Sequence, residues 1–94
     1  MASGGGKANV RIELFGVPRV RAGRRECTVT ATSVAEAVSA LEHQCPELTG
    51  CVIVGGRLLP AYRLSLNGER FISDPNTRLN PDDSLVLVAA DAGG

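Results

Sequence analysis

The sequence predicts an α+β domain in which a single helix packs across one face of a β-sheet. Three observations support this fold class: short stretches in which apolar and polar residues alternate, one stretch with helical spacing, and a length of 94 residues. The predicted order is strand, strand, helix, strand, strand and final strand. A single helix cannot cover both faces of a sheet, so we expect it to cover one.

The first two strands are predicted at residues 10–15 (VRIELF) and 27–31 (CTVTA). The alternation in the first places Val10 on the core face and Phe15 on the opposite face. The second is rich in β-branched residues, which favour strands. Residues 16–26 (GVPRVRAGRRE) contain glycines and a proline, so we expect them to form the long, basic turn of an antiparallel hairpin, exposed to solvent.

The helix is the clearest element, because the period of the apolar residues changes after residue 33. Ser33 and Glu36 have the spacing of a capping box, in which each side chain accepts a hydrogen bond from the other residue's N–H. Pro46 ends the helix. The apolar face is formed by Val34, Ala37, Val38, Leu41 and Cys45.

The second half of the chain predicts further strands. Residues 52–54 suit a short strand before a Gly-Gly turn, and residues 62–72 suit a hairpin around Asn67-Gly68. The final strand, residues 84–90 (SLVLVAA), should direct Leu85 and Leu87 to the core, with Val86 and Val88 facing away. If the first and last strands pair at the centre of the sheet, Phe15, Val86 and Val88 form an apolar patch beside the C-terminal residues.

Composition excludes several classes of function. Ten basic and ten acidic residues give a net charge of zero, whereas nucleic-acid binding usually leaves a basic excess. No apolar stretch approaches the roughly 18 residues of a membrane span, and the first nine residues lack the apolar run of a signal peptide. We expect a cytoplasmic protein without nucleic-acid or membrane partners. Its expected segments are a flexible lead-in (1–9), a domain (10–90) and a flexible tail (91–94).

The side chains suggest no catalytic or metal site. Three cysteines have no metal-ligand spacing, so we expect small reduced thiols; a Cys45–Cys51 disulfide is disfavoured in a cytosolic protein. His43 is the only histidine, and a lone histidine near a helix end suits a structural or solvated role. Asp82 and Asp83 suit a solvated turn better than acid–base chemistry.

Gly93 and Gly94 end the sequence with a pattern that suits chemistry at a carboxyl group. Glycine has no Cβ, so its backbone can pass a narrow channel while the terminal carbonyl stays open to attack. Activation of a carboxylate requires a good leaving group, such as AMP from ATP. The acyl adenylate can then accept sulfur or an amine.

From Val10 to Gly94 the chain resembles the MoaD/ThiS-type family of ubiquitin-like sulfur carriers (molybdopterin synthase small subunit-like). These are β-grasp domains that end in Gly-Gly. The resemblance is carried, in order, by VRIELFG, SVAEAVSALEHQCPEL, YRLSLNGERF and LNPDDSLVLVAADAGG. It implies a β-grasp fold, with a mixed four- to five-stranded sheet and one helix across one face.

The resemblance implies a carrier or substrate protein rather than an enzyme, with no bound cofactor or metal. An ATP- and magnesium-dependent activating enzyme would adenylate Gly94. A cysteine desulfurase or rhodanese-like protein would supply sulfur to form a thiocarboxylate, which an acceptor synthase would use. The product could be molybdopterin (molybdenum cofactor biosynthesis), thiamine, cysteine or a sulfur-containing natural product. The implied site comprises Gly94 and Gly93 at the reactive end, with Phe15, Arg19, Val86, Val88, Asp91 and Ala92 contacting partners.

Two other functions remain open from the sequence. The chain could be a protein modifier joined to its targets through Gly94; its single lysine, Lys7, argues against lysine-linked chains. It could instead be a binding module in which Gly93 and Gly94 have no role. A plant-type ferredoxin, which has a related fold, is excluded because it needs four closely spaced cysteines.

Overall fold

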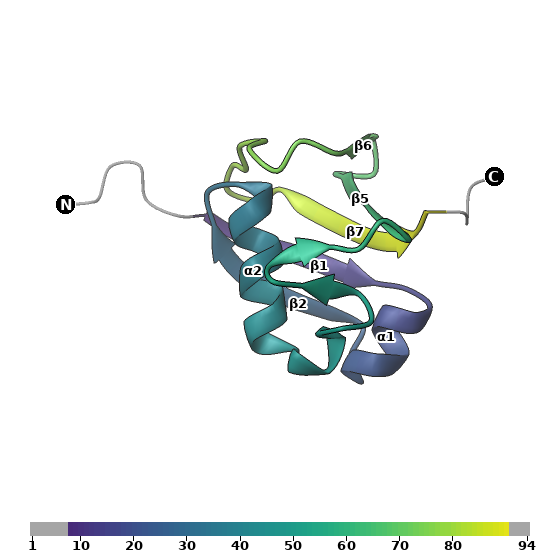
Figure 1. The fold of residues 1–94 in the computed structure, drawn as a ribbon. Coiled ribbons are helices and arrows are strands. Elements are labelled where there is room, and N and C mark those ends of the chain that lie inside the picture. Colours follow the sequence, from purple (N-terminus) through teal and green to yellow (C-terminus); the bar gives the residue numbers. More distant parts are fainter. Residues whose placement is uncertain (1–7, 91–94) are drawn as a thin grey trace.

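A mixed five-stranded β-sheet forms one layer of the protein (Figure 1). The computed structural model describes residues 8–90. The strand order is β2-β1-β7-β5-β6, and β1 and β7 are parallel, while the other neighbours are antiparallel. The first and last strands therefore pair at the centre of the sheet, which is the condition under which an apolar patch was expected. The strands are β1 (Ala8–Leu14), β2 (Glu26–Ala31), β5 (Tyr62–Leu66), β6 (Arg70–Ile72) and β7 (Ser84–Ala89).

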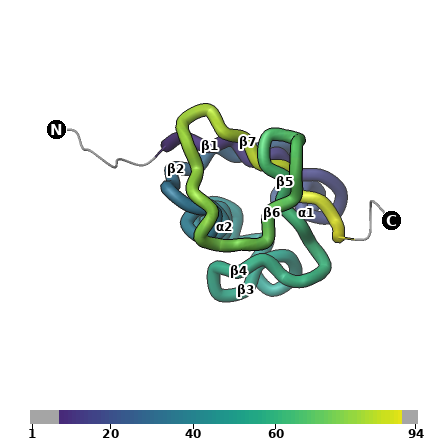
Figure 2. Tube along the Cα trace, turned by 90° about the horizontal axis from the view of Figure 1, so that it is seen from above, coloured from purple at the N-terminus to yellow at the C-terminus, as the bar shows by residue number. Residues whose placement is uncertain are grey.

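Helix α2 (Val34–Gln44) lies across one face of this sheet, which confirms the predicted α+β class. Leu41 of α2 is buried, as are Leu85 and Leu87 of β7, so the core lies between the helix and the sheet. The side chains are mostly aliphatic, and burial of a single leucine or valine contributes about 1.5–3 kcal/mol. Within residues 8–90, the opposite face of the sheet carries no helix (Figures 1 and 2).

The predicted basic turn is wrong in one respect, because it contains a short helix, α1 (Val17–Ala22). Pro18 lies in the first turn, where its missing N–H costs nothing, and its side chain is buried. Gly23 ends the helix in the left-handed conformation (φ 72°), and its N–H donates to the carbonyl of Arg19 at 2.9 Å. The glycines and proline that suggested a turn are therefore the boundaries of a helix.

The capping of α2 also differs from the expected box. The Ser33 hydroxyl accepts from the Glu36 N–H at 3.2 Å, as predicted. However, Glu36 Oε1 accepts from the N–H and hydroxyl of Thr32, both at 2.8 Å. Thr32 offers two donors to one carboxylate oxygen, so the carboxylate reaches one residue beyond the cap. Pro46 does stop the helix and begins a 3-10 turn, η1 (Pro46–Leu48).

One of the two hairpins agrees with the sequence analysis, and the other adds a strand, β4, after the predicted short strand and Gly-Gly turn. Strands β3 (Ile53–Val54) and β4 (Arg57–Leu58) form a separate pair on the same side of the sheet as α2 (Figure 2). Strands β5 and β6 are joined through Asn67 and Gly68, whose φ angles of 55° and 70° are the positive values that this turn requires. Strand β1 begins at Ala8 rather than Val10, because Ala8 is buried and paired with Ala31.

Candidate functional site

The open face of the sheet carries an apolar row on β7. Leu85 and Leu87 are fully buried, whereas Val86 and Val88 are half-buried on the face away from α2, as the alternation predicts. Because β7 lies between β1 and β5, these valines occupy the middle of the open face.

Phe15 and Arg19 lie next to this row, at the end of β1. The Phe15 N–H donates to the carbonyl of Leu87 at 3.3 Å, which continues the parallel pairing and places Phe15 beside Val88. The phenyl ring is 42% exposed. The Arg19 guanidinium lies 4.9 Å from the ring centroid, and Arg19 Nε donates to the carbonyl of Leu14 at 3.0 Å. The structure therefore brings together Phe15, Arg19 and Val88.

A second arginine–aromatic pair, which the sequence analysis missed, lies on the other side of the valines. Phe71 on β6 is 55% exposed, and the Arg63 guanidinium lies 5.3 Å from its ring centroid. Arg63 is paired with Val88 across β5 and β7. Each arginine–aromatic contact is worth about 0.5–1 kcal/mol at an exposed site, so it holds both side chains in place. We call Phe15, Arg19, Arg63, Phe71, Val86 and Val88 the docking surface.

The chain leaves the sheet at the end of β7. The Ala90 N–H donates to the carbonyl of Ala61 at 2.6 Å. A shallow hollow of about 340 Å³ at this point is lined by Ala61, Tyr62, Ala89 and Ala90. The predicted site residues Asp91, Ala92, Gly93 and Gly94 lie outside the described residues.

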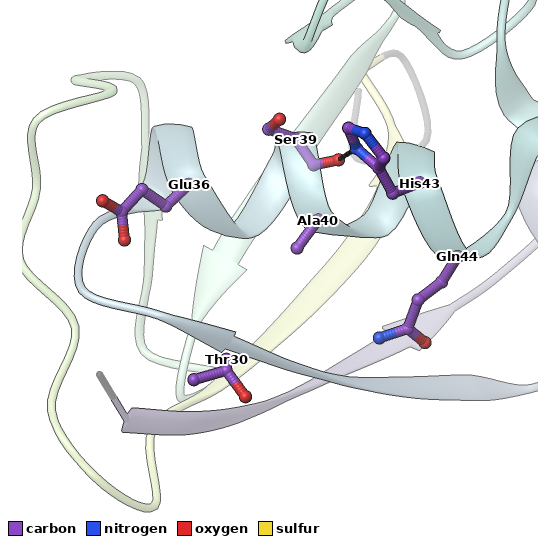
Figure 3. Close-up of a pocket in the computed structure, with 6 residues that line it drawn as sticks. All are labelled: Thr30, Glu36, Ser39, Ala40, His43 and Gln44. Carbon is purple, nitrogen blue, oxygen red and sulfur yellow. Dashed lines mark hydrogen bonds between the residues drawn. The ribbon is translucent and has the colours of Figure 1, made fainter. Parts of the chain in front are cut away.

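A larger hollow of about 530 Å³ lies between α2 and the edge strand β2 (Figure 3). Two of its polar side chains contact neighbouring backbone: His43 Nδ1 lies 3.1 Å from the carbonyl of Ser39, and Gln44 Nε2 donates to the carbonyl of Thr28 at 2.8 Å. These bonds agree with the structural role expected for His43. The hollow is lined by Thr30, Glu36, Ser39, Ala40, His43 and Gln44.

The three cysteines are free thiols. Cys27 and Cys45 are fully rather than half-buried, and their sulfur atoms lie 3.3 Å apart. Burial, together with the hydrogen bond to Cys27, raises the pKa of Cys45 to about 11. Such a thiol is inert at neutral pH, because the thiolate is the nucleophile. Within residues 8–90 no cluster of His, Cys, Asp and Glu side chains could hold a metal ion.

Asp82 and Asp83 shape the turn before β7. Asp82 has a positive φ of 71°. The Asp83 carboxylate accepts from the Asn80 N–H at 2.8 Å and from Asn67 Nδ2 at 3.0 Å. The turn interpretation of these residues is therefore supported. None of the helices in the described part of the chain has the length and apolar character of a membrane span.

Comparison with known proteins identifies the fold. No protein-family model matches the chain, and no curated protein matches it. Among solved structures, SAMP1 from Haloferax volcanii is 25% identical, with a TM-score of 0.77 over 93% of this chain and 100% of that chain. A chain of the Amycolatopsis orientalis BexX/CysO complex is 16% identical, with a TM-score of 0.73 over 90% and 99%. A chain of the complex of subunits 1 and 2 of molybdopterin-converting factor from Helicobacter pylori is 20% identical, with a TM-score of 0.62 over 92% and 99%.

The chain therefore has the β-grasp fold that the resemblance implied, and it shares this fold with SAMP1 and with the chains of the two complexes.

Proposed function

We propose that this protein is a sulfur carrier whose Gly94 is adenylated, converted to a thiocarboxylate and used as a sulfur donor in biosynthesis. The observation that supports the proposal most directly is the position of β7. This strand contributes Val86 and Val88 to the docking surface and then leads into residues 91–94. Gly94 follows Val88 by six residues in the sequence, so a partner that binds the docking surface is close in sequence to the carboxyl group on which the proposal depends.

In this proposal the docking surface binds a partner protein and takes no part in the reaction at Gly94. Its charged groups are two arginines, each placed over an aromatic ring, and it contains no carboxylate, thiol or imidazole. ATP and magnesium are therefore assigned to the activating enzyme. Pyrophosphate leaves when the adenylate forms, and AMP leaves when the outer sulfur of a persulfide attacks the Gly94 carbonyl to give an acyl disulfide. A second thiol of the partner enzymes then attacks the donor's sulfur, which releases the Gly94 thiocarboxylate and leaves a disulfide between the two partner thiols.

The residues after β7 have separate roles in this proposal. Gly93 and Ala92 have little or no side chain, so they pass a narrow channel in the partner. Asp91 carries a charge close to the reactive end and meets a cationic group on the partner. Cysteine desulfurases and rhodanese-like proteins are the proposed sources of the persulfide.

An acceptor synthase is the proposed final partner. Two of the structural neighbours were solved as complexes with a second protein, one in the BexX/CysO pair and one in molybdopterin-converting factor. The same pattern of association is proposed for this chain through its docking surface. Molybdopterin, thiamine, cysteine and sulfur-containing natural products are the candidate destinations of the sulfur.

Protein modification is a second candidate function, because SAMP1 from Methanosarcina acetivorans, a further neighbour, is a small archaeal modifier protein. In that case the Gly94 adenylate would react with a lysine amine of a target. Isopeptide adducts ending in Gly94, found by mass spectrometry of proteins from the source organism, would establish this function.

ATP–pyrophosphate exchange with the activating enzyme of the same organism tests the carrier proposal. Deletion of Gly93 and Gly94 should abolish exchange. Val88→Asp should reduce it at least tenfold, because a carboxylate then lies in the apolar contact. Thr28→Asp is the matched control, since Thr28 is exposed on β2, outside the docking surface. Exchange that survives the deletion would contradict the proposal.

A further inference from the structure

The outer face of α1 is an exposed apolar and basic surface that the sheet does not use. Val17 and Val20 are 51% and 79% exposed, and they account for two of the five large apolar side chains exposed within residues 8–90. Val17, Val20 and Arg21 are spaced three and four residues apart, so they share one helix face. The opposite side of the helix is anchored, because Pro18 is buried and Ala22 packs against the core. We call Val17, Val20 and Arg21 the α1 patch.

The segment that contains the α1 patch is basic. Residues 14–25 contain four arginines and no acidic residue, although the whole chain has no net charge. Arg21 is exposed, and the ion pair found within residues 8–90 joins Arg11 to Glu26 instead. The Arg24 guanidinium donates to the Cys27 sulfur at 3.7 Å. Arg21 is the basic member of the α1 patch itself.

The α1 patch is continuous with the docking surface. Arg19 belongs to α1, yet its guanidinium lies over Phe15 and its Nε binds the carbonyl of Leu14. The helix is thus fixed to the end of β1. In both views α1 lies at the end of the molecule where β7 finishes (Figures 1 and 2). Any enzyme that acts on the residues after β7 approaches this end.

We infer that the α1 patch binds the activating enzyme, at an apolar surface rimmed by carboxylates, and that it determines how efficiently this carrier is selected. The inference rests on the proposed function. An exposed apolar pair beside an arginine suits a protein contact, because charged residues are depleted at the centre of an interface and arginine is enriched in it. The activating enzyme must release the carrier after each cycle. Electrostatic attraction suits such a partner, because it accelerates association more than it strengthens the final complex.

The test compares variants of the full chain in ATP–pyrophosphate exchange with the purified activating enzyme at low ionic strength. Val17→Ser combined with Val20→Ser should raise the KM for the chain about tenfold and leave kcat unchanged, because only binding is lost. Arg21→Glu should raise the KM by a similar factor, and Arg21→Gln by less. The effect of Arg21→Glu should shrink in high salt, since exposed charges are then screened.

The β3–β4 hairpin supplies matched controls, because its exposed side chains belong to neither the α1 patch nor the docking surface. Val54→Ser changes an exposed valine and Arg57→Glu an exposed arginine; both should leave the KM unchanged. Thermal unfolding by circular dichroism checks that every variant folds.

The outcomes separate the inference from the proposed function. Wild-type KM for the α1 variants, with loss of exchange for Val88→Asp, would overturn the inference and leave the carrier function standing. Normal activation with loss of sulfur transfer to the acceptor synthase would also overturn it, because the occupant would be the synthase. Self-association that depends on Val20, seen by sedimentation, would assign the patch to a second copy. If the wild-type chain supported no ATP–pyrophosphate exchange, the result would contradict the proposed function itself.

Discussion

Substitutions on the two faces of β7 should have different effects. A change on the buried face should lower stability, whereas a change on the open face should weaken partner binding. Leu87 is fully buried and loses three carbon atoms in Leu87→Ala. At about 0.8 kcal/mol for each buried carbon, plus the cost of the cavity, the free energy of unfolding should fall by about 3 kcal/mol. For a chain of this length that corresponds to a fall in Tm of about 15 °C. Val88→Thr keeps the shape and β-branching of a half-buried side chain, so it should cost under about 1 kcal/mol.

Urea unfolding followed by circular dichroism measures both variants, and ATP–pyrophosphate exchange measures their function. Leu87→Ala should lower the midpoint but keep its exchange activity at temperatures where it is folded. Val88→Thr should change the urea midpoint little. It should raise the KM for the chain, because a hydroxyl replaces a methyl group in the docking surface. Equal losses of stability, or a larger loss for Val88→Thr, would refute the assignment of the two faces.

Three further predictions concern the scaffold. Ser33→Ala should lower the free energy of unfolding by about 1 kcal/mol, because the Glu36 N–H loses its acceptor; urea unfolding measures it. Asn67→Gly keeps the positive φ but removes the side-chain hydrogen bonds to Asp83 and Ser84, which should cost about 1–2 kcal/mol in the same assay. Because burial raises the pKa of Cys45 from 9.0 to about 11, the unfolded chain ionises first. Stability should therefore be constant below about pH 9 and fall as the pH rises through 11, and Cys45→Ala should remove this slope.

Local patterns predicted the elements that carry their own periodicity. The long helix α2 and the strands β1 and β7 show several repeats of their apolar pattern, and the Asn67-Gly68 turn has a specific conformational signature. Helix α1 was missed because six residues complete fewer than two turns, which is too few to show a period. Its stability comes from the burial of Pro18 and from the contact of Arg19 with Phe15, and both are tertiary contacts.

The candidate site was predicted in part for the same reason. Alternation alone placed Val86 and Val88 on the open face, and the pairing of β1 with β7 brought Phe15 beside them. Arg63 and Phe71 were missed because their position depends on the register of β5 against β7 and β6, which is set by contacts distant in sequence. The roles of Gly93 and Gly94 come from the sequence and its resemblance to sulfur carriers.

The carrier function is tested most directly by the mass of the intact protein. The chain would be incubated with ATP, magnesium, the activating enzyme of its own organism and a persulfide donor. The proposal predicts a gain in mass that corresponds to the replacement of one oxygen atom by sulfur, mapped to Gly94 by fragmentation and absent without ATP. An unchanged mass, in a reaction where the same activating enzyme modifies another carrier, would contradict it.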